Sequence, residues 1–423
     1  MVPFKPKVLY QHTATLIENK LYILGGSDSN DQFVGKTFFY LDVSVPFDTQ
    51  KLLWQDLSNV DLVPPHALAT SVKGGVNNDT LFLYGGMSPD NTMALVYTFD
   101  SRAILWDHPN MPKIVGSKFE LTGVNNNGKM YLWGGANDTT YFNDMLILDT
   151  INLSWGKGSL DNAPTPRCDY GATLLPNNNI IYIGGSNFSV VYDPDTLNVS
   201  QGSALALNEV YLYDTINDNW SIKVTSGKIP SNRAAFSTVL GLDGQRIIIF
   251  GGYFKNPGYL DTTLYVLDLT NFNWYIPKIS GKIPNPRVYH KADVIGKFMV
   301  ISFGYGPNKQ AESDILLLDI SNNEEYIWTT KFDPSVPNLS SSPPSTLPSP
   351  STLSPSTLSP TTLSSSNLPL QSPSPSNKLV IIGTSVAFLV GGIILTVGGF
   401  FLYKWNKNKL NRKNIIRIQG NEN

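Results

Sequence analysis

The sequence predicts an all-β protein, a six-bladed β-propeller, followed by a disordered stalk and one transmembrane α-helix. Three observations support this prediction. A glycine pair follows a short apolar run five times at intervals of roughly 50 to 70 residues, and a sixth copy keeps one of the glycines. Each copy continues into a second apolar run that ends in Asp, and then reaches a Trp. A Ser/Thr/Pro-rich segment and an uncharged apolar segment follow the repeats.

The glycine pairs mark the turn after the second strand of each repeat. A turn that needs a positive φ angle or a close backbone approach favours a residue without a side chain. The sixth copy, MVISFGYG, is interpreted as keeping the first glycine, Gly304, and replacing the second with Tyr305. The repeat glycines are Gly25, Gly26, Gly85, Gly86, Gly134, Gly135, Gly184, Gly185, Gly251, Gly252 and Gly304.

The tryptophan at the end of each repeat supplies a large flat surface that can fill the gap between twisted blades. In four of the six copies it lies six residues after the Asp, as in LDTINLSW. The connection between them is rich in Asn, Asp and Thr and predicts a hairpin. The repeat tryptophans are Trp54, Trp106, Trp155, Trp220, Trp274 and Trp328.

Each later repeat opens with Pro, then Arg, then an aromatic residue or His, as in PTPRCDYGATLL. Each unit therefore supplies four short strands, and their sheet is apolar on both faces, so that it cannot bury itself alone. Radial stacking of six such sheets solves this problem. No repeat is split between the two ends, so closure of the ring is left either to packing or to a piece that precedes this sequence. The propeller is predicted over 1–332, with blades at roughly 8–62, 63–113, 114–163, 164–229, 230–282 and 283–332.

These residues resemble the kelch repeat, whose hallmark is a glycine pair, then Tyr and Asp, then Trp at this spacing. The resemblance covers about residues 8–332 and implies a propeller of the galactose oxidase and kelch structural group. The whole layout resembles single-pass membrane kelch proteins of the fungal type.

The resemblance to galactose oxidase makes a copper-radical oxidase an alternative. Such a site needs a Cys cross-linked to a Tyr, a second Tyr and two His. Tyr289 and His290 resemble the adjacent ligand pair, and Cys168 is the single cysteine. The position of His290 is occupied by Tyr170 and Phe236 in other repeats, so we expect a bulky structural ring there and predict no catalytic residue, cofactor or metal.

Three arginines suggest a sialidase-like cluster as another alternative. They recur at one position of successive repeats, which favours a structural role. They are Arg167, Arg233 and Arg287.

Charge and composition distinguish the propeller from the segments on its C-terminal side. Residues 1–377 hold 24 Lys and Arg against 32 Asp and Glu, which argues against nucleic acid as the partner because phosphate binding needs a positive surface. Residues 333–377 collapse to Ser, Pro, Thr and Leu, the composition of a disordered and often O-glycosylated stalk.

The segment 378–403 is predicted to cross a membrane, since residues 379–403 carry no charge and suffice to span the hydrocarbon core as a helix. Small residues four apart in this segment suggest a weak helix-mediated dimer. The basic tail at 404–423 should remain cytoplasmic, which makes a type I protein of the plasma membrane or secretory pathway with its propeller extracellular or lumenal. The first residues contain no apolar leader, so we expect a start site upstream of this sequence.

We predict that the partner binds to the irregular insertion in the fourth repeat, because the residues at the regular positions of the repeat are needed to stack the blades. This repeat runs 35 residues from its second glycine to its Trp, against 20 in the second and third. The excess, residues 186–209, should form a loop on one face whose shortening leaves folding intact. An aromatic ring beside carboxylates suits a glycan or a basic peptide. The candidate partner-binding residues are Phe188, Tyr192, Asp193 and Asp195.

The predicted function is therefore a membrane-anchored recognition module that binds a protein or glycan at the cell surface without catalysis. One alternative is a galactose-oxidase-like or other carbohydrate-active enzyme, and another is a tail-anchored scaffold that faces the cytosol. Asn-x-Ser/Thr motifs permit N-glycosylation. They begin at Asn78, Asn137, Asn152, Asn187, Asn198, Asn219 and Asn338.

Overall fold

The computed structural model describes residues 3–335 apart from 91, 112–115 and 311–313. The chain divides into two units, Met1–Thr346 and Leu347–Asn423, and the described residues belong to the first. The predicted transmembrane helix and basic tail, and the stalk from residue 336 onward, lie outside the described residues. Within the described part, no helix has the length and apolar character needed to cross a membrane.

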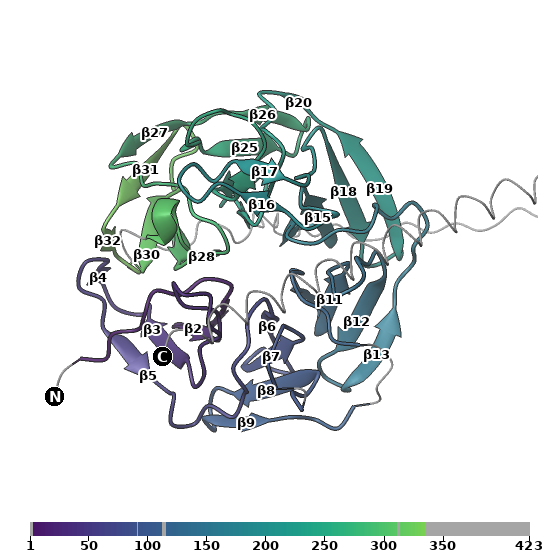
Figure 1. Cartoon of the computed structure of the whole chain (residues 1–423), viewed down its shortest axis with the longest axis vertical. Helices are drawn as coiled ribbons and strands as arrows, with labels where there is room; N and C mark the ends of the chain where they lie inside the picture. Colours follow the sequence, from purple (N-terminus) through teal and green to yellow (C-terminus); the bar gives the residue numbers. More distant parts are fainter. Residues whose placement is uncertain (1–2, 91, 112–115, 311–313, 336–423) are drawn as a thin grey trace, which may run out of the picture. The chain divides into compact units, whose positions relative to one another are not determined.

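Six antiparallel sheets surround a common centre, as the repeat predicts (Figure 1). Blades 1 to 3 are four-stranded meanders, and their second strands are buried on both faces because each packs against the neighbouring blades. Their strands are β1 (Thr13–Ile17), β2 (Lys20–Leu24), β3 (Phe38–Asp42), β5 (Trp54–Asp56), β6 (Thr70–Gly74), β7 (Thr80–Tyr84), β8 (Val96–Asp100), β9 (Leu105–Asp107), β10 (Val124–Asn126), β11 (Lys129–Trp133), β12 (Met145–Asp149) and β13 (Ser154–Lys157).

Blades 4 to 6 carry additions to this plan. Blade 4 contains an inserted hairpin between its second and third strands, and blades 5 and 6 gain a fifth, parallel strand from the segment that precedes each of them, β20 and β27. The prediction of four strands therefore holds for blades 1 to 4 only. The strands are β14 (Gly171–Leu174), β15 (Asn179–Ile183), β16 (Val191–Tyr192), β17 (Val199–Gln201), β18 (Glu209–Asp214), β19 (Asn219–Val224), β20 (Ser226–Gly227), β22 (Ser237–Leu240), β23 (Arg246–Phe250), β25 (Tyr265–Asp268), β26 (Asn273–Tyr275), β27 (Lys278–Gly281), β28 (Lys291–Ile295), β29 (Phe298–Ser302), β30 (Ile315–Asp319) and β31 (Glu325–Thr329).

The repeat glycines all have positive φ, as predicted, but the register of the sixth copy was wrong. A Cβ atom on Gly252 would lie 2.5 Å from the carbonyl oxygen of Ala234, which belongs to the same blade. A Cβ atom on Gly304 would meet Val288 in the same way, at 2.8 Å. Gly304 is therefore the second glycine of the pair, and Phe303, with φ of 45°, replaces the first.

The repeat tryptophans lie on the outermost strand of each antiparallel meander and join neighbouring blades, which confirms their predicted role. The indole N–H of Trp220 donates to the carbonyl of Ser159 in blade 3 at 2.9 Å. The indole of Trp54 donates in the same way to Asp314 of blade 6, at 3.3 Å.

The ring closes through backbone hydrogen bonds that the sequence did not reveal. One residue from each blade adopts a left-handed conformation, donates its N–H to the equivalent residue of the preceding blade and accepts from the next, at 2.8 to 3.1 Å. We call this set the hydrogen-bonded ring. Its members are Gln11, Leu68, Glu120, Asp169, Ala235 and Tyr289.

A second contact joins the last blade to the first. Strand β32 (Lys331–Phe332) pairs with β4 (Phe47–Asp48), and the rings of Phe47 and Phe332 stack with centroids 4.5 Å apart. Closure therefore rests on hydrogen bonds and on packing. The innermost strands line a central channel of about 420 Å³, which begins beneath the hydrogen-bonded ring.

Candidate functional site

The two faces of the propeller differ in construction. In a four-stranded meander, the connections between strands one and two and between strands three and four share one end, which we call the turn face. The longer loops between strands two and three, and the connections between blades, share the other end. This second end carries the hydrogen-bonded ring, and we call it the ring face.

Two carboxylates from different blades meet at the hydrogen-bonded ring. Ligand atoms of Glu120, Asp169 and Cys168 all lie within 4.8 Å of one another. The hydroxyl groups of Tyr253 and Tyr289 donate to the Asp169 carboxylate at 3.1 and 3.4 Å. This arrangement brings two carboxyl groups together at the mouth of the channel.

The environment of these carboxylates favours their neutral forms. Burial raises the pKa of Asp169 well above its usual range, and the nearby Glu120 raises it further. Burial likewise raises the pKa of Glu120. Neither carboxylate forms a salt bridge within the described part of the chain. The charge of Lys291 nevertheless attracts the Asp169 carboxylate and opposes part of this rise in its pKa.

The ring face carries charges of both signs, because its connections between blades contribute basic residues such as Lys118, Arg233 and Arg287. Some of its carboxylates are neutralised, since Asp31 pairs with Lys309 at 2.6 Å and Asp144 pairs with Lys118. Acidic residues nevertheless outnumber lysines in the loops that follow the second strands. The described ones are Asp28, Asp31, Asp90, Asp138, Asp144, Asp193, Asp195, Asp261 and Asp314 against Lys36, Lys255 and Lys309.

The insertion of blade 4 packs over its neighbours and does not stand free. Strands β16 and β17 form a hairpin, and Tyr192 stacks on Tyr253 of blade 5 with ring centroids 5.3 Å apart. The Tyr192 hydroxyl bonds to that of Tyr305 in blade 6, and Leu197 and Leu207 are fully buried. The hairpin is therefore part of the core on this side of the ring face.

The four predicted binding residues fall into different environments. Phe188 is 64% exposed, and Asp195 is also exposed. Tyr192 is held by its stacking partner. The Asp193 carboxylate accepts the backbone N–H groups of Asp195 at 2.8 Å and Thr196 at 3.3 Å, and so shapes the hairpin turn. The structure does not bring the four together as one site.

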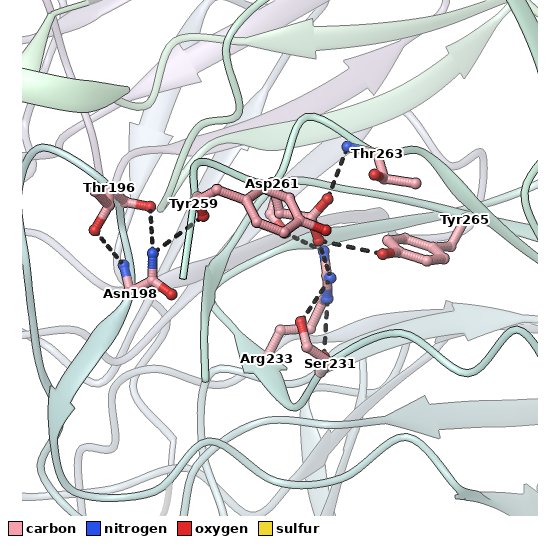
Figure 2. Close-up of polar contacts among 9 residues, drawn as sticks. Thr196, Asn198, Ser231, Arg233, Tyr259, Asp261, Thr263 and Tyr265 are labelled. Carbon is pink, nitrogen blue, oxygen red and sulfur yellow. Dashed lines mark hydrogen bonds and ion pairs between the residues drawn. The ribbon is translucent and has the colours of Figure 1, made fainter. Parts of the chain in front are cut away.

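A hydrogen bond fixes the hairpin against blade 5. Figure 2 shows the side-chain amide of Asn198 between Thr196 and Tyr259, and its Nδ2 donates to the carbonyl oxygens of both residues at 3.2 Å.

The three repeat arginines are structural. Figure 2 shows Arg233 beside Ser231 and Asp261, and its guanidinium lies 2.7 Å from the Asp261 carboxylate with both side chains 1% exposed. The guanidinium groups of the three also donate to the carbonyl oxygen at the glycine turn of the same blade. The donors are Arg167, Arg233 and Arg287, and the acceptors are Gly184, Gly251 and Phe303.

The residues considered for copper serve other contacts. His290 Nε2 lies 2.8 Å from the Ser237 hydroxyl, and its ring packs against Phe250. His12 makes the equivalent contact with Ser302 at 3.0 Å. Among the described residues, the one cluster of possible metal ligands joins Cys168 to Glu120 and Asp169 and contains no histidine.

Sequence reasoning missed the acidic pair because its members belong to different blades. A signal was present in the repeat, since the residue two places after the position of the repeat arginine, which blades 4 to 6 share, differs in all six blades. Positions that keep one backbone role but vary in side chain are candidates for specificity, and this position is the hydrogen-bonded ring.

Known proteins resemble the chain over the propeller. The KLHDC2/KLHL20/DRC7 Kelch-repeats domain matches residues 11–201 and 198–347. Kelch domain-containing protein 3 of Rattus norvegicus is 24% identical over 333 residues, which cover 73% of this chain and 84% of that protein. Acyl-CoA-binding domain-containing protein 5 of Arabidopsis thaliana is 28% identical over 219 residues, which cover 49% of this chain and only 31% of that protein.

A solved structure titled "Structure of YjhT" shares the fold, with a TM-score of 0.57 and 15% sequence identity over 78% of this chain and 99% of that one. The strand order, the glycine turns and the bridging tryptophans agree with these matches, and the chain belongs to the kelch-repeat domain family.

Proposed function

We propose that the propeller is a protein-recognition module and that its ring face receives a basic peptide segment. The observation that carries this proposal is the pair Glu120 and Asp169, which share one mouth and lack a salt-bridge partner among the described residues. Two carboxylates this close repel each other when both are ionised, so an ammonium or guanidinium group supplied by a ligand would relieve that repulsion and form charge-assisted hydrogen bonds.

The partner enters a site framed by rings as well as acids. Tyr253 and Tyr289 point their hydroxyls at Asp169, and Tyr10 packs on Tyr305 with ring centroids 4.4 Å apart. Aromatic rings favour a cationic side chain through their π faces. Phe188 and Asp195 lie on the hairpin of the same face and extend the surface toward a longer peptide.

The proposal includes the setting of the module. Residues 378–403 anchor it in a membrane, with the propeller extracellular or lumenal and the basic tail in the cytoplasm, and the charge distribution of the sequence supports this orientation. The module has no catalytic role, since His290 and the repeat arginines are committed to buried contacts. The chain belongs to the kelch-repeat domain family, and binding is the function that its ring face supports best.

A peptide array tests the proposal without a known partner. The probe is a set of Lys- and Arg-containing peptides, each beside a twin with its basic residues changed to Glu, and the full chain in detergent is applied. We expect retention on basic peptides only. The double variant E120Q/D169N should bind at least about tenfold more weakly, because each charge-assisted hydrogen bond contributes roughly 1.5 kcal/mol or more.

The matched control is D138A, which removes an exposed carboxylate from the same face and should bind like the parent chain. Equal binding of basic and acidic twins, or full binding by E120Q/D169N, would refute the proposed site. Retention on a glycan array with no basic peptide bound would replace the protein partner with a carbohydrate.

A further inference from the structure

The Asn-x-Ser/Thr motifs divide between the two faces of the propeller. Six of the seven lie within the described residues. Three fall on the ring face, in the loops that follow the second strands of blades 3 and 4. The other three fall on the turn face of blades 2, 3 and 4. The ring-face set is Asn137, Asn187 and Asn198, and the turn-face set is Asn78, Asn152 and Asn219.

The ring-face asparagines are all half-buried, and two of them make side-chain hydrogen bonds. Asn198 uses its Nδ2 to hold the hairpin against blade 5, as Figure 2 shows. The Asn137 side-chain oxygen accepts from the backbone and hydroxyl of Thr139 at 3.0 and 3.1 Å, which also occupies the hydroxyl of the motif. The side-chain oxygen of Asn187 is buried. A sugar on Asn198 would displace both hydrogen bonds of its Nδ2, and a sugar on Asn137 or Asn187 would have to be accommodated at a half-buried side chain.

The turn-face asparagines are exposed. Asn78 lies in the turn between β6 and β7, Asn152 lies in the turn between β12 and β13, and Asn219 is the first residue of β19. Each is exposed to solvent on its own blade, and the three blades are consecutive in the ring. Their hydrogen bonds lie at the surface, since Asn152 Nδ2 donates to the Asp149 carboxylate at 2.9 Å and Asn78 Oδ1 accepts from Asn125 at 3.2 Å. A branched sugar attached at any of them would extend into solvent without meeting the core.

An exposed aliphatic side chain lies within three residues of each turn-face asparagine. Val76 is 77% exposed, Ile151 is 49% exposed and Ile216 is 66% exposed. Single apolar side chains at a surface are common, and these three lie on separate blades. Their closeness in sequence to the three asparagines places each within reach of a sugar attached there.

We propose that Asn78, Asn152 and Asn219 carry N-linked glycans that cover Val76, Ile151 and Ile216 and leave the ring face open to its partner. In the transfer, Nδ2 forms a bond to the anomeric carbon of a lipid-linked sugar diphosphate. The bond from that carbon to the diphosphate breaks, and one amide proton is lost with the leaving group. This inference rests on the lumenal placement of the propeller that we propose above.

The test uses the full chain translated with microsomes behind a cleavable leader peptide, so that the propeller enters the lumen. We expect a mobility shift that the amidase for N-linked glycans reverses, and each of N78Q, N152Q and N219Q should remove one step. The matched controls N137Q, N187Q and N198Q should remove none. Peptide mapping of the protease-resistant, folded product should place the sugars on the turn face alone.

Three outcomes would overturn the inference. The first is that the sugars map to Asn198 or Asn187 in folded protein. The second is that a propeller shown by protease protection to be lumenal carries no sugar, and the third is that the unmodified chain self-associates through the turn face and that I216K disperses it, since a second copy then covers the face. Glycan mapping requires no binding partner, and E120Q/D169N should keep the same glycans, so a failure here is distinguishable from a failure of the ring-face proposal.

Discussion

At the scale of single residues, backbone geometry determines which positions of the repeat tolerate change. Gly252 and Gly258 both have positive φ, of 90° and 73°. A Cβ atom on Gly252 would lie 2.5 Å from a backbone oxygen, whereas one on Gly258 would meet nothing within 4 Å. The two glycines therefore separate the cost of the φ angle from the cost of the clash.

We predict that G252A lowers the free energy of unfolding by roughly 3 kcal/mol, while G258A lowers it by about 1 kcal/mol. The reason for the difference is the collision with Ala234, which the backbone of β23 and β24 (Tyr253–Phe254) would have to relieve. Denaturant unfolding of the two variants measures it. Equal values for both would mean that the glycine turn does not depend on close packing.

The buried histidine of blade 6 gives a pH prediction at the same scale. Burial lowers the pKa of His290 to about 3. Below about pH 6.5 this histidine is therefore protonated in the unfolded chain but stays neutral in the folded chain until the pH approaches 3. Its contribution to stability is therefore complete above pH 6.5 and is lost as the pH falls toward 3.

H290F should remove this dependence, because the repeat already accepts a phenylalanine at the equivalent position in blade 5. Between pH 7 and pH 4.5, the parent should lose about 2 kcal/mol more than H290F does. Thermal melts of both proteins across this range provide the comparison. Parallel pH profiles would show that His290 is protonated in the folded state.

At the scale of elements, the insertion of blade 4 is more firmly packed than the sequence suggested. A loop at 186–209 was expected to be removable without effect on folding. Its hairpin instead buries Leu197 completely and stacks Tyr192 on Tyr253, so it contributes to the core of blades 4 and 5. The length of an insertion is visible in a sequence, but the partners that it reaches in other blades are not.

We predict that L197A lowers the free energy of unfolding by about 2 to 4 kcal/mol, the cost of a buried cavity. F188A removes an exposed ring from the same hairpin and should change it by less than about 0.5 kcal/mol. Chemical denaturation of the two variants tests the role of the hairpin. If L197A unfolds like the parent, the hairpin is a free loop and can be shortened without loss of the fold.

At the scale of the whole molecule, the ring is closed by contacts between the first and last blades. Phe332 is buried and stacks on Phe47, and the backbone of Gln11 bonds to that of Tyr289. Each blade buries its faces only against its neighbours, so opening one junction exposes two blades. Closure should therefore affect the stability of the entire propeller.

F332A is predicted to lower the free energy of unfolding by about 3 kcal/mol or more and to preserve a single transition. K331A, which removes an adjacent exposed salt bridge to Asp48, should cost less than about 1 kcal/mol. Unfolding followed by both tryptophan fluorescence and circular dichroism distinguishes the cases. Separate transitions in F332A would show that the blades are independent and that closure contributes little.

The sequence predicted those parts of the fold that recur. The glycine pair and the tryptophan, of which Gly252 and Trp220 are examples, recur at fixed positions of the repeats. Their spacing sufficed to predict the number of blades and the order of the strands within each blade. It could not predict that Glu120 and Asp169 meet, because that contact depends on how consecutive blades rotate about the channel. The register of Gly304 was misjudged for a related reason, since only the neighbouring blade distinguishes the first glycine of a pair from the second.

The most direct test of the central claim is the pH dependence of binding. A basic peptide selected on the array is titrated into the full chain by calorimetry between pH 5 and pH 8, beside E120Q/D169N. Because burial raises the pKa values of Asp169 and Glu120, deprotonation should strengthen the attraction as the pH rises. We predict an affinity that rises with pH in the parent chain and stays flat in the double variant. A pH-independent affinity in the parent chain would contradict it.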